Sequence, residues 1–337
     1  MASACILGCA GPRLSADEHA FFAAARPFGL ILFLRNVENP DQLRRLTDDF
    51  RASVGDADAP VLIDQEGGRV QRLKPPHWPD FPSAARFGEL HARDPARALE
   101  AVRLGARLIA AELVPLGINV DCMPVADLRY PEGHDVIGDR AYGGEAATVA
   151  KLARAAAEGL LAGGVLPVVK HIPGHGRARA DSHKTLPVVE TPLAELDRTD
   201  FEAFRRLADL PVAMTAHVVY AALDREHPAT VSPKLVGEVI RRRIGFSGLL
   251  LTDDLSMGAL AGSLGSRTQA ALAAGCDLAL HCNGKFAEMR EVAEAAPGLA
   301  GEAAARAAAA LARLKKPTEM ADVAEARQRF SAMIAAL

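Results

Sequence analysis

One short stretch of this 337-residue chain carries more reactive side chains than any other. Residues 170–176 read Lys-His-Ile-Pro-Gly-His-Gly, and residues 181–183, a few positions later, read Asp-Ser-His. The glycines and the proline exclude a regular helix, so His171 and His175 do not form the i, i+4 pair of a helical zinc site. We therefore predict a polar loop that brings a carboxylate and an imidazole together, as in an active site.

Asp181 and His183 lie two positions apart, which places both side chains on one side of an extended segment. A carboxylate that binds an imidazole nitrogen fixes the tautomer of the ring and stabilises its charged form. This pair makes His183 a candidate general acid and base near neutral pH, with Asp181 as its partner. The simpler alternative is a solvated loop histidine.

Asp253 follows the apolar residues 248–252, which read Gly-Leu-Leu-Leu-Thr. A strand over these residues delivers its carboxylate to the end of a sheet, where it suits a nucleophile or an oriented base. The structural alternative is that one of the two adjacent aspartates caps a helix beginning near Leu255 and Met257. We assign the nucleophile to Asp253 and the supporting role to Asp254.

These side chains need a scaffold, and the apolar pattern predicts one. Short apolar runs alternate with helical patterns along the whole chain, which favours parallel strands joined by crossover helices. The runs number eight, which is the number that closes a single (β/α)8 TIM-type barrel of the α/β class. They cover residues 4–9, 29–34, 61–64, 118–123, 166–169, 212–215, 249–252 and 277–281. A doubly wound open sheet or a pair of domains is the alternative.

Helix signals fill the segments between the runs. A capping side chain precedes a proline at Asn39-Pro40, Asp94-Pro95 and Ser232-Pro233, and residues 148–161 carry one buried apolar stripe. An alanine-rich helix over residues 301–314 follows the last strand. We expect a barrel domain over residues 1–316, with residues 317–337 forming a helical tail packed on it.

In such a barrel the chemistry lies where strands end and the following loops begin. Polar side chains occur at these positions after almost every run, and such charges are costly without partners or ligands. They are Arg35, Asn36, Asp64, Gln65, Glu66, Arg69, Gln71, Arg72, Asp127, His217, Asp253, Asp254, His281 and Asn283.

Composition excludes several classes of function. The formal net charge of −3 offers no basic excess for nucleic acid, and no apolar run is long enough to span a membrane. The five cysteines form no C-x-x-C pair and fit buried reduced thiols. We expect a cytoplasmic protein with no cofactor and no metal.

Five ordered motifs together resemble glycoside hydrolase family 3, and more closely its bacterial β-N-acetylglucosaminidase branch, which acts in peptidoglycan recycling. They read IDQEGGRVQR at 63–72, VIGDR at 136–140, KHIPGHG at 170–176, DSH at 181–183 and TDDLSM at 252–257. The resemblance implies a retaining exo-β-N-acetylglucosaminidase that removes terminal N-acetylglucosamine, as from GlcNAc-1,6-anhydro-muramoyl peptides, through a covalent glycosyl-enzyme. The second domain of many family members is not expected here, and with the resemblance we expect a monomer whose partner is a small carbohydrate.

The resemblance also implies roles for single residues. The family's nucleophile falls on Asp253, its acid/base histidine on His183 and the partner aspartate on Asp181. Its sugar-binding positions fall on Asp64, Arg72, Arg140, Lys170 and His171.

The residues themselves support these assignments. Asp64 can accept two hydroxyl hydrogen bonds from a sugar, while Arg72 and Lys170 supply charged donors. A histidine with an ordinary pKa near 6.5 can donate and recover a proton without the desolvation that a glutamic acid needs. We also hypothesise, from the glycines at 174 and 176, that a mobile loop carries it in.

Three other readings compete with this one. A metal-dependent hydrolase would recruit His171, His175, His183, Asp181 and Asp253 as ligands, and chelation tests it. A phosphorylase, or a broader β-glycosidase of the same family, would use the same residues on another acceptor or sugar. A sugar-binding barrel without activity is the non-enzymatic reading.

Overall fold

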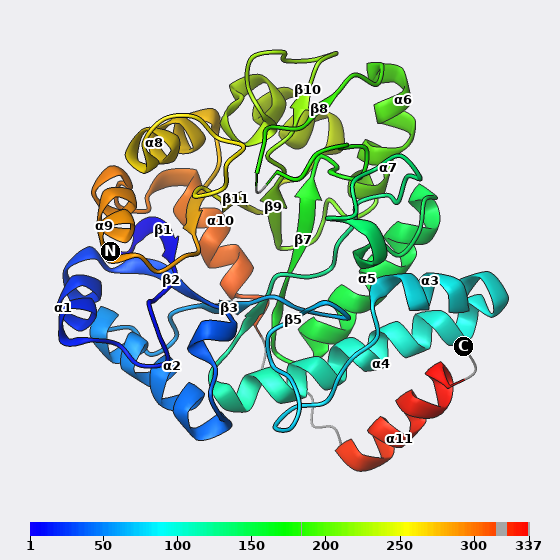
Figure 1. Ribbon diagram of the computed structural model, residues 1–337, viewed down its shortest axis with the longest axis horizontal. Helices are drawn as coiled ribbons and strands as arrows, with labels where there is room; N and C mark the ends of the chain where they lie inside the picture. The colour runs from blue at the N-terminus through cyan, green and yellow to red at the C-terminus, as the bar shows by residue number, and fades with distance from the viewer. Residues whose placement is uncertain (183, 315–321, 336–337) are drawn as a thin grey trace.

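Eight parallel strands close into a barrel in the computed structural model, which describes residues 1–182, 184–314 and 322–335. Each of the eight apolar runs forms one of these strands, so the (β/α)8 prediction is confirmed (Figure 1). Around the barrel the order is β1-β12-β11-β9-β7-β6-β3-β2. The strands are β1 (Ser3–Leu7), β2 (Pro27–Leu32), β3 (Val61–Ile63), β6 (Val120–Asp121), β7 (Leu166–Ile172), β9 (Val212–Thr215), β11 (Leu249–Asp254) and β12 (Leu278–His281).

Two small sheets decorate the loops. A hairpin of β4 (Gln65–Gly67) and β5 (Val70–Gln71) follows β3, and β8 (Val188–Val189) pairs with β10 (Val219–Tyr220). Both follow barrel strands directly or through a loop, so they shape the C-terminal end of the barrel.

Helices surround the barrel and begin where the sequence signals them. Asn39 caps α2 by accepting from the backbone N–H of Gln42, and Asp94 caps α4 by accepting from the backbone N–H of Arg97. Ser232 accepts from the backbone of Leu235 in the same way. The helices are α1 (Ala16–Ala25), α2 (Pro40–Val54), α3 (Ala84–Arg93), α4 (Pro95–Leu113), α5 (Ala146–Ala162), α6 (Leu193–Arg198), α7 (Asp200–Arg205), η5 (Leu235–Ile244), α8 (Leu264–Ala274), α9 (Phe286–Ala295), α10 (Gly301–Leu311) and α11 (Val323–Ile334), with short turns η1 (Leu34–Asn36), η2 (Val114–Leu116), η3 (Gly138–Arg140) and η4 (Ala229–Val231).

The hydrophobic core has two layers. Side chains that alternate along the strands fill the barrel interior, and the others pack against the surrounding helices. Ala307 and Ala310 of α10 join the interior layer, so α10 covers the end of the barrel where the strands begin. The opposite end, where the strands finish, is left to the loops.

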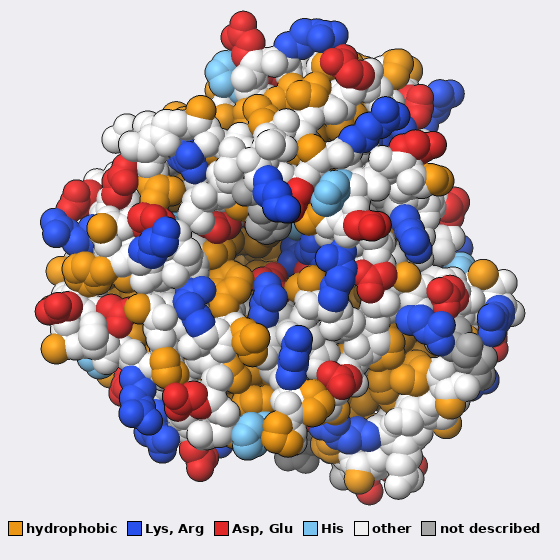
Figure 2. All heavy atoms as spheres, in the orientation of Figure 1, with side chains coloured by type: hydrophobic (Ala, Val, Ile, Leu, Met, Phe, Trp, Pro, Cys, Tyr) orange, Lys and Arg blue, Asp and Glu red, His pale blue; other side chains and the backbone are white. Residues whose placement is uncertain are grey.

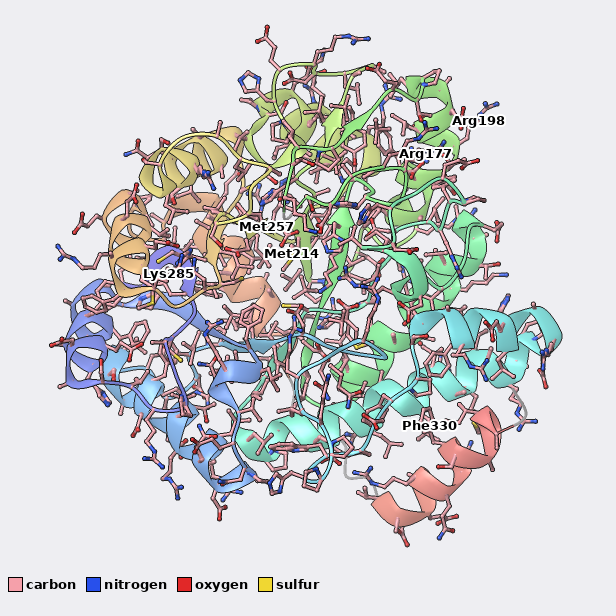
Figure 3. All side chains as sticks on the ribbon, in the orientation of Figure 1. Arg177, Arg198, Met214, Met257, Lys285 and Phe330 are labelled. Carbon is pink, nitrogen blue, oxygen red and sulfur yellow. The ribbon has the colours of Figure 1, made fainter. Side chains whose placement is uncertain are left out.

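The last helix packs against α4, and its Phe330 also contacts two aromatic rings in and just before α3 (Figure 3). Phe330 of α11 is 6% exposed, and its ring lies 6.0 Å from that of Phe81 and 6.3 Å from that of Phe87. Gly105 of α4 faces the same ring, because a Cβ there would lie 2.8 Å from Phe330 Cε2. No helix in the described part of the chain is long and apolar enough to cross a membrane.

Replacing Phe330 by Ala is expected to lower the free energy of unfolding by about 3 kcal/mol, because it removes the ring and leaves a cavity against Gly105. Urea unfolding followed by circular dichroism measures this. Val323→Ala, at a 37% exposed position of the same helix, is the matched control and should change stability by less than about 0.5 kcal/mol. Equal effects of the two substitutions would contradict the packing role.

Candidate active site

A cavity of about 370 Å³ opens at the end of the barrel where the strands finish. Figure 2 shows it as a hollow near the middle of the face, with blue Lys and Arg side chains around its edge. Its lining comes from strand ends and the loops after them, namely Ile31, Phe33, Arg35, Asp64, Arg69, Val70, Arg72, Val136, Arg140, Lys170, His171, Met214, Asp253, Asp254, Met257, Leu280, Cys282 and Asn283. The sugar-binding candidates and the nucleophile candidate therefore share one cavity.

A second cavity of about 410 Å³ lies beside Tyr130, Arg177 and Val189. It is slightly larger, but none of the candidate residues lines it. We place the active site in the cavity at the strand ends, because barrel enzymes carry their chemistry there.

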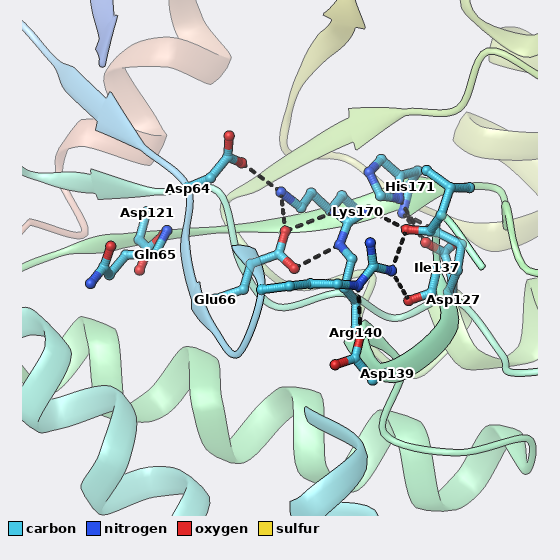
Figure 4. A network of polar contacts seen from close by, with 12 residues as sticks. Asp64, Gln65, Glu66, Asp121, Asp127, Ile137, Asp139, Arg140, Lys170 and His171 are labelled. Atoms are coloured by element: carbon cyan, nitrogen blue, oxygen red, sulfur yellow. Dashed lines mark hydrogen bonds and ion pairs between the residues drawn. The ribbon is translucent and has the colours of Figure 1, made fainter. Parts of the chain in front are cut away.

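A buried lysine forms the centre of the first cavity's polar floor (Figure 4). Lys170 Nζ lies 2.8 Å from Asp64 Oδ1 and 2.7 Å from Glu66 Oε1, and the lysine side chain is 3% exposed. Asp64 comes directly after β3, Glu66 lies in β4 and Lys170 lies in β7. One ammonium group on β7 thus joins two neighbouring carboxylates that precede it by about a hundred positions in the sequence.

This cluster keeps its charges although it is buried. Burial alone would raise the pKa of Asp64, but the charges of Lys170 and Arg72 hold that pKa well below its usual range. Burial is outweighed in the same way at Glu66, where Arg140 and Lys170 hold the pKa at about 2. Burial disfavours the charged form of Lys170, yet the two carboxylates raise its pKa above the ordinary value. All three groups are therefore ionised at neutral pH.

Two arginines extend the cluster toward the cavity. Arg140 grips Glu66 with two bonds of 2.8 Å, from Nε to Oε2 and from Nη2 to Oε1. Arg72 Nη2 lies 2.9 Å from Asp64 Oδ2, and its guanidinium carbon lies 5.1 Å from the centre of the Phe33 ring. Such paired contacts fix the plane of each guanidinium, so both arginines are held in a set orientation where they line the cavity.

His171 is held by a buried aspartate. Its Nδ1 lies 2.6 Å from Asp127 Oδ2, and Asp127 is fully buried. Burial would raise the pKa of Asp127, but His171 and the hydrogen bonds around it lower that pKa below the ordinary value. Because an ionised carboxylate only accepts, His171 Nδ1 carries the proton and donates. The ring edge with Nε2 is turned away from Asp127, and the residue lines the cavity.

Asp253 and Asp254 end β11 and both line the cavity. Burial would raise the pKa of Asp253, but nearby His171 and His217 lower it, so the carboxylate is ionised as a nucleophile must be. Asp253 Oδ1 accepts from the backbone N–H of Asp254 at 2.8 Å. The side chain is thereby held in place next to its own peptide.

The expected helix near Leu255 and Met257 is absent, because these residues form turns and the next helix, α8, begins at Leu264. Asp254 still acts as a cap, since its carboxylate accepts from Ser256 N at 3.0 Å and from Ser256 Oγ at 2.6 Å. Asp254 therefore has a supporting role, but it caps a turn and not a helix. This turn brings Met257 to the cavity, which Met214 of β9 also lines (Figure 3).

The glycines of the 170–176 segment allow close packing, whereas the hypothesis was that they make the loop mobile. A Cβ on Gly176 would lie 1.8 Å from Leu128 O, and one on Gly174 would lie 2.9 Å from Asp200 Cβ. Tyr220 Oη donates to Gly174 O at 2.5 Å, and the segment is buried. Close packing, not mobility, explains both glycines, so they give no support to the loop motion hypothesised from them.

Only Asp181 of the predicted acid/base pair lies within the described residues. Asp181 is half-buried and is not among the residues that line the cavity, and His183 lies outside the described residues. Two further strand-end candidates, His217 and His281, are fully buried and do not line it either. Among the described residues, no group of three or more His, Cys, Asp or Glu side chains is arranged to hold a metal ion.

Two residues on which the site depends, Glu66 and Asp127, are not among the predicted site residues. In the sequence Glu66 is only a polar residue after β3, and Asp127 only one after β6. The signal for a further carboxylate is charge count, because the predicted sugar-binding positions hold the cations of Lys170, Arg72 and Arg140 but only one carboxylate, Asp64. The free thiols were predicted correctly, although Cys282 is half-buried and lines the cavity.

Comparisons with known proteins agree on one family. Residues 10–316 match the model for the glycosyl hydrolase family 3 N terminal domain. The β-hexosaminidase of Bordetella avium is 40% identical over 280 residues, covering 81% of this chain and 79% of that protein. The β-hexosaminidase of Alkalilimnicola ehrlichii is 41% identical over 284 residues, covering 82% and 80%.

Solved structures give the same picture. NagZ from Neisseria gonorrhoeae, in complex with N-trifluoroacetyl-D-glucosamine, superposes with a TM-score of 0.85 at 31% identity, covering 99% of this chain and 96% of that one. A family 3 β-N-acetylglucosaminidase from Paenibacillus gives a TM-score of 0.80 at 30% identity. The alignment covers 97% of this chain but only 61% of the Paenibacillus protein.

The ion cluster predicts how stability depends on pH. Glu66 has a pKa of about 2 in the folded protein against an ordinary 4.5, so its contribution is complete above about pH 5 and is lost as the pH falls toward 2. Glu66→Gln should be less stable at pH 7. It should also lose roughly 1 to 3 kcal/mol less between pH 5 and pH 3 than the unmodified protein does. Urea unfolding at several pH values measures both.

Glu302→Gln is the matched control for this experiment, because the Glu302 side chain is 85% exposed. It should leave the pH dependence unchanged. An identical pH dependence for the Glu66→Gln variant and the unmodified protein would show that Glu66 is not held ionised by the cluster.

Proposed function

The chain belongs to glycosyl hydrolase family 3 and is a β-hexosaminidase, and from this premise we propose that it is a retaining exo-β-N-acetylglucosaminidase. In the proposed reaction Asp253 attacks the anomeric carbon of a terminal N-acetylglucosamine while His183, paired with Asp181, protonates the leaving oxygen. Water, activated by the same histidine, then releases the sugar from Asp253. Both steps invert the anomeric centre, so its configuration is retained overall.

One observation carries the proposal: an ionised, half-buried Asp253 shares a cavity with the Asp64, Lys170 and Arg72 cluster. Asp64 presents carboxylate oxygens and Lys170 an ammonium group, and these suit the hydroxyl groups of one pyranose. A carboxylate held ionised at neutral pH suits nucleophilic attack, since a protonated carboxylic acid is a poor nucleophile. The ligand in the Neisseria NagZ complex, an N-acylated glucosamine by its name, supports the choice of sugar.

The chain's own residues account for the separate tasks. Asp64, Lys170, Arg72, Arg140 and His171 bind and orient the sugar from one side of the cavity, and Asp253 stands on the strand next but one to β7 in the barrel order. Met214 and Met257 supply apolar wall near Asp253, which limits water at the attacked carbon. The proton donor has to come from a loop above, because the floor holds permanently charged groups.

The charge around the cavity suggests the leaving group. Arg35 lines the rim and is exposed, and its guanidinium donates from Nε to Cys9 O at 2.9 Å and from Nη2 to Cys282 O at 2.5 Å. Bonds to carbonyl oxygens fix the guanidinium but leave its charge available. A positive rim favours an anionic leaving group, and a 1,6-anhydro-muramoyl peptide carries carboxylates. We propose that GlcNAc-1,6-anhydro-muramoyl peptides are the natural substrate.

The proposed activity predicts a sugar preference that can be measured directly. The protein should hydrolyse p-nitrophenyl N-acetyl-β-glucosaminide with a kcat/KM at least roughly a hundredfold above that for p-nitrophenyl β-glucoside, because the cavity is proposed to use the N-acetyl group. Asp253→Asn should lose roughly a thousandfold or more in kcat while keeping its fold. A preference for the glucoside would favour the broader β-glycosidase. Turnover by Asp253→Asn near that of the unmodified protein would remove Asp253 as nucleophile.

The rim charge predicts an effect on one substrate class. Arg35→Gln should raise KM for a GlcNAc-anhydro-muramoyl peptide roughly fivefold, or about 1 kcal/mol, with much less effect on an uncharged aryl glycoside. Steady-state kinetics at low and high salt measure this, since screening should shrink the difference. Arg86→Gln, at a surface arginine on α3, is the control. A loss that is equal for charged and uncharged substrates would contradict an anionic leaving-group site.

A further inference from the structure

His175 is the histidine of the 170–176 segment that the sugar-binding cavity does not use. It is 3% exposed and does not line the cavity. Its backbone N–H donates to Asp127 Oδ1 at 2.6 Å, so it shares a carboxylate with His171. Its ring Nε2 lies 3.0 Å from the hydroxyl oxygen of Ser182, which is 2% exposed. Burial lowers the pKa of His175 to about 4, so the ring is neutral at neutral pH.

Ser182 makes a second contact in the opposite direction. Its carbonyl oxygen accepts from the backbone N–H of Ala259 at 3.2 Å. Ala259 is 4% exposed and lies on the loop that follows β11, the strand that carries Asp253. Ser182 is therefore bound through its side chain to the β7 side of the site and through its backbone to the β11 side.

Both partners of Ser182 are themselves anchored. His175 is fixed by Asp127, as described above. The loop after β11 is fixed at its start by Asp254 and by Arg267 of α8, which donates from Nη1 to Leu255 O at 2.7 Å and to Met257 O at 3.2 Å. A residue held between two fixed points has little freedom, so the backbone at Ser182 is set by the barrel and not by its own loop.

We propose that Ser182 is a positioning residue for the acid/base step, acting through the His175–Ser182–Ala259 bridge. The inference rests on the proposed function, in which Asp181 and His183 move the proton. Ser182 stands between these two residues in the chain, and its carbonyl belongs to the planar peptide unit that leads to residue 183. Fixing the side chain and the carbonyl of Ser182 therefore fixes the piece of backbone on which the proposed acid/base pair depends.

The bridge explains three features together. It gives the second histidine of the KHIPGHG segment a task that needs no metal. It accounts for a serine that is buried inside a polar loop, where an unpaired hydroxyl would be costly. It also connects the segment of the proposed proton donor to the loop that follows the strand of the proposed nucleophile. The positions of the two groups therefore depend on the same part of the barrel.

The test uses the dependence of rate on the leaving group. Ser182→Ala is measured on a series of aryl N-acetyl-β-glucosaminides, from 2,4-dinitrophenyl to phenyl. We expect kcat/KM to fall roughly tenfold for the phenyl glycoside and less than about twofold for the dinitrophenyl glycoside, which needs little protonation. For the dinitrophenyl substrate kcat and KM should fall together, and azide should restore kcat by forming the glycosyl azide. A substitution that only loosened the fold would lower all rates alike.

A second variant and a control keep the test decisive. His175→Phe keeps a ring but removes Nε2, and it should reproduce the pattern of Ser182→Ala. The double variant should lose no more kcat/KM than the more affected single variant, because both substitutions remove the same hydrogen bond between His175 and Ser182. Thr47→Val is the control: Thr47 is fully buried on α2 and donates to Leu116 O at 2.8 Å, far from the cavity. It should leave the leaving-group dependence unchanged.

His183→Ala, measured in parallel, separates the two levels of the proposal. If His183→Ala shows the steep leaving-group dependence and azide rescue while Ser182→Ala shows neither, the positioning role of Ser182 is wrong and the proposed function stands. If His183→Ala itself lacks them, the proposed acid/base assignment fails. Equal losses on all substrates for Ser182→Ala would also overturn the bridge.

Discussion

The site depends on one buried ammonium group held between two carboxylates. The Lys170 side chain is 3% exposed and contacts both Asp64 and Glu66. Burying the ammonium group without the carboxylates, or the carboxylates without the ammonium group, would carry a large desolvation cost. Each carboxylate is then completed by an arginine, Arg72 for Asp64 and Arg140 for Glu66. Since removing one member would leave a buried charge unpaired, the positions of all five side chains are fixed together. The proposed sugar-binding groups are thereby ordered before any ligand arrives.

A separate buried carboxylate, Asp127, organises the segment that follows β7. It accepts from His171 Nδ1 and from the backbone of His175, so one buried charge sets both a cavity residue and a loop residue. The loop is therefore tied to the barrel more firmly than its glycines suggest. In the proposed mechanism this division makes sense: the floor of the site carries permanent charges, and proton transfer is left to a segment above it. The bridge through Ser182 would connect that segment to the strand of Asp253.

Much of this architecture could be predicted from the sequence, for physical reasons that differ between features. The eight strands follow from apolar runs, because a parallel strand is buried on both faces and reads as continuous hydrophobic sequence. The cavity residues follow from polar side chains at the ends of those runs. Pairings such as Lys170 with Glu66 could not be predicted, because they join residues about a hundred positions apart whose register depends on closure of the barrel. The glycines at 174 and 176 misled for a related reason, since close approach to Leu128 and Asp200 is visible only in three dimensions.

The central claim is that Asp253 is the nucleophile of a two-step reaction. A mechanism-based fluorinated N-acetylglucosaminyl fluoride, which forms the glycosyl-enzyme quickly and releases it slowly, tests this most directly. After proteolysis and mass spectrometry, we predict one sugar per protein, attached to the peptide that contains Asp253. A label on a different carboxylate, or time-dependent inactivation with no covalent sugar, would contradict the account.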